Sequence, residues 1–158
     1  MLEGKLLLGK NFGFKNELLT NILFNPCAIG FDVLGKDSKY NLYARALTPL
    51  FVLEMDGRLF KLVYQKNLEL QQFVQKQLYS RFIEVENKCD LLLNKSSFER
   101  IKIFLIYIFS NNSVTRNRSR VFEISMTHLD ISLYVHTSRQ SVTTLLNSLR
   151  KEGRNHKL

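Results

Sequence analysis

Short apolar runs separated by turn residues fill the first third of the chain. They cover residues 5–9, 17–24, 28–34 and 40–55, with Gly, Asn, Pro and Asp between them. Regularly spaced runs of this kind predict antiparallel strands of a sandwich or barrel. Four or five strands make a small, open sheet, so we expect an incomplete β-domain.

The pattern changes to a helical repeat after Asp56. A short helix is predicted over residues 58–64, and Asn67 is placed to cap a long helix that reaches about Asn94. Apolar residues recur along this helix every three or four positions, which gives one continuous stripe. The stripe consists of Leu70, Val74, Leu78, Phe82, Val85, Cys89 and Leu92.

Further apolar residues lie off this stripe, so the long helix has two apolar faces to cover. Either a second copy of the helix covers one of them, or both are buried within one chain. The small size of the β part favours the second copy, and the stripe is then a dimer seam.

Two capping boxes mark the last third of the chain. Ser97 and Arg100 first open a helix over 98–110, which is followed by a basic loop at 111–120 and a short strand at 121–124. The boxes are Thr127 with Asp130 and Thr137 with Gln140. They predict two short helices joined by a tight turn at Val135 and His136.

The second of these helices is amphipathic. Its apolar residues, which we expect to be buried, are Val142, Leu145, Leu146 and Leu149. Its polar residues, which we expect to be exposed, are Arg139, Gln140, Thr143, Thr144 and Asn147. Two helices joined by about three residues form the helix-turn-helix pattern, whose second helix enters the DNA major groove. An ordinary amphipathic helix pair is the alternative.

The polar side chains have the chemistry of base recognition. Arg139 offers a donor fork for guanine O6 and N7, and Gln140 matches adenine. Thr143 and Thr144 can bond a base or touch a thymine methyl. The predicted phosphate contacts are Thr127, Thr137 and Ser138, two of which lie with free amides at a helix start.

The charge of the chain is concentrated in the same region. Of the net charge of +9, residues 96–158 supply +6, with ten basic and four acidic residues. This excess favours a polyanionic partner for the last third. The alternative is a solvated basic surface.

Other classes of protein are disfavoured. No apolar run approaches the roughly 18 residues of a membrane span. Cys27 and Cys89 match no metal-ligand spacing and are expected to stay reduced in a cytoplasm. His128, His136 and His156 are not spaced as ligands, and the sequence has no Ser/His/Asp arrangement or glycine-rich phosphate loop, so we do not expect an enzyme.

The stretch "LDISLYVHTSRQSVTTLLNSLRKEG" resembles the helix-turn-helix of the Crp/Fnr family of bacterial transcription regulators. In that family an apolar turn precedes Ser-Arg-Gln/Glu-Thr/Ser-Val, and Leu-Leu and Leu-Arg-Lys-Glu-Gly follow. Upstream, "SSFERIKIFLIYI" resembles the helix that leads into the DNA-binding domain. "ELQQFVQKQLYSRFIEVENKCDLLL" resembles the dimerisation helix, and "NLYARALTPLFVLEMDGRLFKLV" the end of the cyclic-nucleotide-binding-like barrel.

The resemblance implies an α+β protein with three parts. These are a partial cyclic-nucleotide-binding-like β-barrel of jelly-roll type (1–66), a dimerisation helix (67–95) and a helix-turn-helix DNA-binding domain (96–158). It implies a homodimer that reads a near-palindromic operator in double-stranded DNA through the 137–151 helix, with RNA polymerase as a candidate partner. Arg139, Gln140, Thr143 and Thr144 then occupy the base-reading positions. Position 144 is often Arg in relatives.

The effector chemistry of the family is not matched. Its pocket uses a Gly-Glu pair and an Arg-Ser/Thr pair, where this chain has Gly30-Phe31 and Tyr40-Asn41, with Arg45 nearby. We therefore expect no cyclic-nucleotide response. Two distant cysteines cannot supply the four thiolates of an Fnr-type cluster. No cofactor is expected.

The ends also differ from those of relatives, which have further elements before Leu2 and a β-hairpin wing after Gly153. We expect a winged-helix-like domain without its wing, in a chain truncated at both ends. Two functions follow: a DNA-binding regulator, or a dimerisation module that interferes with a full-length relative. The missing wing and Thr144 favour the second, and a gel shift separates them.

Overall fold

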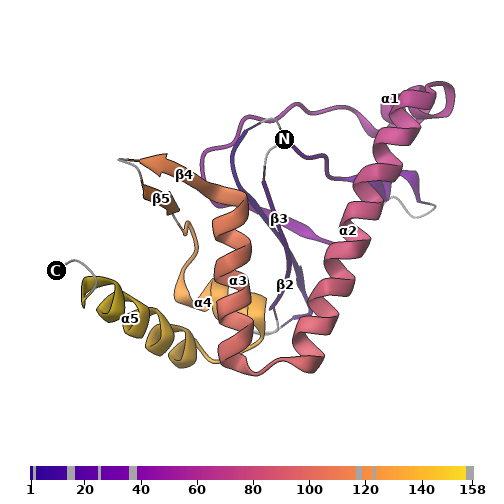
Figure 1. Cartoon of the computed structure of the whole chain (residues 1–158). Helices are drawn as coiled ribbons and strands as arrows, with labels where there is room; N and C mark the ends of the chain where they lie inside the picture. Colours follow the sequence, from indigo (N-terminus) through magenta and orange to yellow (C-terminus); the bar gives the residue numbers. More distant parts are fainter. Residues whose placement is uncertain are drawn as a thin grey trace. The chain divides into compact units, whose positions relative to one another are not determined.

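The protein contains two compact units, Met1–Asn87 and Lys88–Leu158. The computed structural model (Figure 1) describes residues 1, 3–13, 17–24, 26–35, 39–116, 119–122 and 124–155. Both units contain helices and strands, so the expected mixed class is confirmed. Among the described residues, no helix is long and apolar enough to cross a membrane.

The N-terminal unit holds a three-stranded antiparallel sheet of order β2-β1-β3. Its strands are β1 (Leu6–Asn11), β2 (Glu17–Leu23) and β3 (Tyr43–Ala46). The predicted strands at 5–9 and 17–24 are therefore confirmed. The described strands form an open sheet and not a closed barrel.

Apolar side chains cover both faces of the central strand of this sheet. Leu6, Leu7 and Leu8 are consecutive and all buried, although alternate residues of a strand point to opposite faces. Leu6 and Leu8 pack with Leu23 of β2 on one face, and Met1, Cys27, Leu42 and Leu50 border this cluster. The small core is thus built mainly from β1 and β2.

Two segments that were predicted as strands fold differently. The run at 28–34 contains a 3-10 helix, η1 (Phe31–Leu34), because Gly30 adopts a left-handed conformation (φ 89°) and turns the chain. Of the run at 40–55, β3 is the strand, and Phe51 forms an isolated bridge with Glu3. Pro49 lacks a backbone donor and so does not extend the ladder.

Two helices complete this unit, and side-chain caps fix their starts. In α1 (Gly57–Lys66), the Asp56 carboxylate accepts hydrogen bonds from the amides of Arg58 (2.9 Å) and Leu59 (3.1 Å). Before α2 (Leu68–Asn94), Asn67 Oδ1 accepts from the Leu70 amide at 2.8 Å. The predicted Asn67 cap and the end near Asn94 are confirmed.

Polar contacts join α2 to β2 and to the segment that follows it. Asn21 Nδ2 on β2 donates to Glu84 Oε2 at 3.0 Å. The Arg81 guanidinium donates to the Ala28 carbonyl and lies 5.3 Å from the centre of the Phe31 ring. One side of α2 therefore contacts β2 and the segment after it, and another side of the helix is exposed.

The C-terminal unit combines three helices with a β-hairpin. Its elements after the end of α2 are α3 (Ser97–Asn112), β4 (Ser113–Arg116), β5 (Ser119–Phe122), α4 (His128–Val135) and α5 (Arg139–Asn155). The loop prediction for 111–120 is wrong: β4 and β5 pair as an antiparallel hairpin, and residues 117–118 lie outside the described residues. The short strand predicted at 121–124 is β5, two residues earlier.

Apolar stripes of the three helices form the core of the C-terminal unit. The buried side chains are Ile101, Phe104 and Ile108 of α3, Ile131 and Val135 of α4, and Val142 and Leu145 of α5. Leu146 is half-buried, and Leu149 is 38% exposed, which corrects its predicted burial. The reason is length: an eight-residue helix such as α4 spans about 12 Å and cannot cover the roughly 26 Å of α5.

Candidate nucleic-acid interface

A complete capping box fixes the start of α4. The Thr127 hydroxyl accepts a hydrogen bond from the Asp130 amide at 3.1 Å, and the Asp130 carboxylate accepts from the Thr127 amide at 3.0 Å. The box pairs amides that a helix start leaves without partners. The sequence prediction for this residue pair is confirmed.

The turn after α4 is tight. His136 adopts the left-handed conformation (φ 51°), and its amide donates to the Ser132 carbonyl. The Thr137 amide donates to the same carbonyl at 3.0 Å. A residue with a side chain in this conformation costs about 1 kcal/mol, so the packing on both sides maintains the turn. His136 was predicted as a turn residue, which is confirmed.

Ser138, not Thr137, caps α5. The Ser138 hydroxyl accepts a hydrogen bond from the Ser141 amide at 3.0 Å and lies 2.8 Å from the Ser141 hydroxyl. The predicted box of Thr137 with Gln140 is therefore wrong by one residue, because adjacent Thr and Ser are both good caps. The helix begins at Arg139.

The outer face of α5 carries the predicted base-reading residues. Arg139, Gln140 and Thr144 are exposed, as is Asn147 one turn further on. The opposite face is fixed by Val142 and Leu145, which are 0% and 3% exposed. The helix thus presents polar groups outward from a rigid apolar base.

Thr143 is half-buried, which corrects its predicted exposure, and its hydroxyl is already engaged. It donates to the Arg139 carbonyl at 2.9 Å and lies 2.9 Å from His128 Nδ1. Since the hydroxyl proton is used, His128 donates from Nδ1 to Thr143. This contact ties the first turn of α4 to α5. No spacing in the sequence indicates this contact, and His128 is predicted from the sequence only as a helix-start residue.

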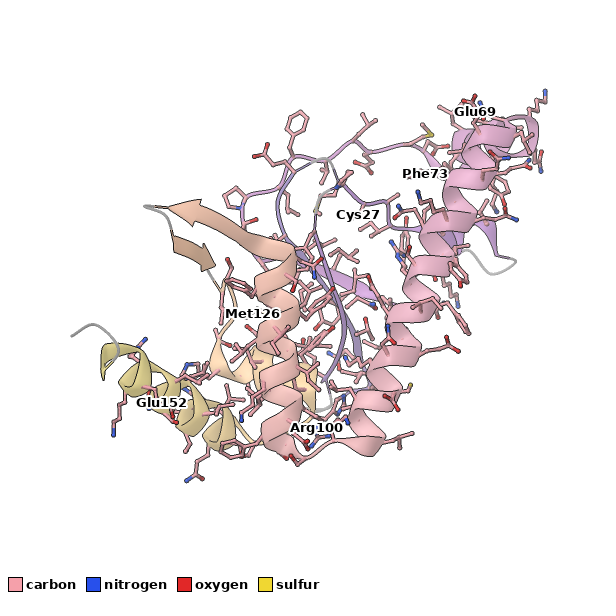
Figure 2. All side chains as sticks on the ribbon, in the orientation of Figure 1. Cys27, Glu69, Phe73, Arg100, Met126 and Glu152 are labelled. Atoms are coloured by element: carbon pink, nitrogen blue, oxygen red, sulfur yellow. The ribbon has the colours of Figure 1, made fainter. Side chains whose placement is uncertain are left out.

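Two cationic side chains, Lys88 and Arg100, act electrostatically on His136 in the turn. Lys88 Nζ lies 4.0 Å from the centre of the Tyr134 ring, and that ring lies 5.4 Å from the Phe104 ring. Arg100, in the first turn of α3 (Figure 2), donates to Ser97. Its Nε is buried without a hydrogen-bond partner among the residues that the structure describes. Burial lowers the pKa of His136, and Lys88 and Arg100 lower it further.

Lys88 gives a prediction for the pH dependence of stability. Burial lowers its pKa from 10.5 to about 8, so the ammonium destabilises the fold below pH 8 and this cost disappears as pH rises toward 10.5. The ring face of Tyr134 offsets part of the cost. We expect Lys88→Met to raise the free energy of unfolding by about 1–3 kcal/mol at pH 7.

Urea denaturation of Lys88→Met and the unmodified chain at pH 7 and pH 10 measures this difference. The gain should shrink at pH 10, because the lysine is then neutral in the folded state. A gain that is equal at both pH values would contradict the account. Other titrating groups are common to both proteins and cancel in the comparison.

Neither a candidate metal cluster nor a disulfide is found among the described residues. The described residues contain no group of three His, Cys, Asp or Glu side chains that could hold a metal ion. Cys27 is half-buried and Cys89 exposed, and both are free thiols.

No family model matches the chain. The chain is 20% identical over 149 residues to the "Putative HTH-type transcriptional regulator ycf28" of Porphyra purpurea, covering 94% of the chain and 62% of that protein. It is 23% identical over 154 residues to the global nitrogen regulator of Nostoc sp. (strain PCC 7120), covering 96% and 69%. The chain thus spans about two thirds of each relative.

Solved structures share the fold over nearly the whole chain. FixK2 from Bradyrhizobium japonicum matches with a TM-score of 0.77 at 15% identity, over 96% of this chain and 73% of FixK2. TTHB099, a CRP-family regulator from Thermus thermophilus, matches with a TM-score of 0.77 at 19% identity, over 96% and 74%. TTHA1359, a CRP/FNR-family regulator from the same organism, has a TM-score of 0.70. The resemblance to Crp/Fnr transcription regulators is confirmed, and the chain has their fold.

Proposed function

We propose that the chain is a DNA-binding transcription regulator that acts as a homodimer and reads a near-palindromic operator through α5. The observation that carries this proposal is the exposed polar face of α5 on a buried apolar base. The similar proteins are transcription regulators and not enzymes, which supports a regulatory function for this chain.

The proposed base contacts are made by the exposed residues of α5. Arg139 and Gln140 lie in the first turn of α5, where a reading helix meets base edges, and Thr144 follows one turn later. The hydroxyl of Thr143 is held by His128, so its methyl group is the part that remains for a thymine.

Phosphate contact is proposed for the starts of the two helices. Thr127 and Ser138 use their hydroxyls as caps, and Thr137 lies half-buried in the turn. The amides in the first turn of α5 point out of the helix end and supply donors to an anion.

Exposed apolar residues on α2 support the homodimer. Val74 is buried within the chain, and Leu70 and Leu92 are half-buried. In contrast, Leu78, Phe82 and Val85 are 46%, 58% and 48% exposed, and Cys89 is also exposed. Their spacing of four, three and four residues is that of a two-helix seam. Burial within one chain accounts for Val74. It does not account for the outer row of α2, which consists of Leu78, Phe82, Val85 and Cys89.

A regulator of this kind would not respond to cyclic nucleotides. Phe31, at the position where relatives have a ribose-binding Glu, is 9% exposed and packs 6.4 Å from the Phe60 ring. A buried phenyl ring cannot accept a hydrogen bond from a ribose hydroxyl. Calorimetry with cyclic AMP and cyclic GMP tests this, and micromolar binding would contradict it.

A dimerisation module is the second candidate function. The exposed row on α2 suits pairing with a longer relative, and Thr144 stands where such relatives often carry Arg, which weakens base reading. Such a module would form a heterodimer that interferes with its partner. RNA polymerase remains a proposed partner of the regulator by resemblance alone.

A gel shift at increasing salt separates the two functions. The regulator should form a sequence-selective complex whose affinity falls about 10³- to 10⁵-fold between 50 and 200 mM salt if it makes 6–10 phosphate contacts. The dimerisation module should form no complex of its own. Absence of any complex at 50 mM salt would reject the regulator.

A further inference from the structure

The contact between His128 and Thr143 joins α4 to a proposed base-reading residue of α5. His128 is the first residue of α4, and Thr143 lies one turn into α5. His128 Nδ1 lies 2.9 Å from the Thr143 hydroxyl oxygen, and both residues are half-buried. A residue outside α5 thus holds a side chain of the proposed reading helix.

The backbone is fixed on both sides of this contact. At the start of α4, the capping box pairs the Thr127 hydroxyl with the Asp130 amide and the Asp130 carboxylate with the Thr127 amide. In α5, Val142 directly precedes Thr143 and is buried. Hydrogen bonds between side chains on rigid elements lock their rotamers. The contact therefore holds Thr143 in one orientation.

The hydrogen bonds of the Thr143 hydroxyl decide which part of this side chain DNA meets. A hydroxyl has one proton to donate and two lone pairs that accept. Thr143 donates its proton to the Arg139 carbonyl at 2.9 Å, and one lone pair accepts from His128 Nδ1. The hydroxyl has no second proton for a base acceptor. The methyl group remains, and its apolar partner in the major groove is the methyl group of thymine.

A threonine without such a partner discriminates poorly between bases. In a helix its side chain divides between two χ1 rotamers, and its hydroxyl donates to or accepts from any base. The bond from His128 favours the rotamer that places the hydroxyl on the Arg139 carbonyl, and it commits the proton to that carbonyl. His128 therefore changes an ambiguous polar reader into an apolar one.

We propose that His128 is a specificity-determining positioning residue, which makes α5 select thymine at the base pair that Thr143 meets. The inference rests on the proposed function of α5, and it names the base that is chosen at one position of each half-site. His128 acts through Thr143 and need not touch a base itself.

The test uses the operator found by selection, in which each thymine is replaced in turn by deoxyuridine, which lacks only the methyl group. Fluorescence anisotropy of the unmodified chain should show a thymine whose replacement raises Kd about 4-fold in one half-site and about 16-fold in both. In Thr143→Ser, which keeps the hydroxyl and lacks the methyl, this cost should disappear. That loss identifies the thymine that Thr143 reads.

Variants of His128 separate positioning from folding. His128→Leu removes the donor, so the deoxyuridine cost at this thymine should largely disappear. His128→Asn should restore the cost, because the asparagine amide nitrogen, like Nδ1, is bonded to Cγ. Thr143→Val/His128→Leu has a methyl group and no hydroxyl to hold, so it should prefer thymine without the histidine. Circular dichroism melts check that each variant keeps its fold.

Thr144 supplies the internal control. It is exposed on the same helix, one residue beyond the threonine that His128 holds. Any deoxyuridine cost that disappears in Thr144→Ser should therefore be the same with His128 and with His128→Leu. A change at that position as well would show a general disturbance of α5 and would contradict the proposal.

The remaining outcomes separate this proposal from the function of α5. If the deoxyuridine cost at the Thr143 position persisted in His128→Leu, or if no thymine showed a cost that depends on Thr143, the proposal would fall and base reading by α5 would stand. If His128→Leu weakened binding equally on the thymine and deoxyuridine duplexes, His128 would have another role, which also contradicts the proposal. If the unmodified chain selected no sequence, both would fall.

Discussion

Replacing Phe82 and Val85 together with glutamate is expected to leave the protein monomeric and to weaken operator binding at least about 100-fold. Both side chains are about half exposed in a single chain, at 58% and 48%, and a partner helix would bury them. Two added carboxylates on each chain would face two others across the seam. Losing the dimer removes the linked second half-site, which is commonly worth about 10²- to 10⁴-fold in avidity.

Light scattering coupled to size exclusion measures the oligomeric state, and anisotropy measures the affinity. The matched control is Ser80→Glu/Asn87→Glu, which adds the same charge to exposed positions on the opposite side of α2. The control should stay dimeric. A dimeric Phe82→Glu/Val85→Glu protein would show that the outer row of α2 is not the seam.

Arg139→Ala is expected to cost about 1–3 kcal/mol at each half-site of the preferred operator, a factor of about 5–150 in Kd per half-site. The loss should be much smaller on an operator in which the contacted guanine is replaced, because the guanidinium then has no pair of acceptors to lose. Arg150→Ala is the control, since Arg150 is exposed on the C-terminal half of the same helix. An equal loss on every sequence would make Arg139 a phosphate contact.

Elements set by local chemistry could be predicted from the sequence. The caps at Asn67 and at Thr127 with Asp130 depend on residues three positions apart, and both were found as expected. The cap of α5 was misplaced because Thr137 and Ser138 have similar local chemistry, and only the packed turn chooses Ser138.

Elements set by distant contacts could not be predicted in the same way. Residues 113–122 have no clear alternation of apolar and polar residues, and their hairpin depends on pairing and on contact with α3. The run at 28–34 is apolar enough for a strand, but Gly30 turns it into a 3-10 helix.

In the candidate site, too, features set by local chemistry could be predicted and features set by distant contacts could not. The exposed face of α5 follows from its helical period, so Arg139, Gln140 and Thr144 could be assigned from the sequence. The contact between His128 and Thr143 joins two helices, and no spacing in the sequence indicates it. The stripe on α2 is continuous in the sequence, whereas in the structure Val74 is buried and Phe82 is 58% exposed.

Selection of binding sites from random double-stranded DNA tests the central claim most directly. We expect the purified chain to enrich two inverted half-sites whose centres lie about one helical turn, roughly 10 base pairs, apart. We also expect Arg139→Ala to lose the preference at one position of each half-site. No enriched sequence with the unmodified chain, or the same sequence from both proteins, would contradict the claim.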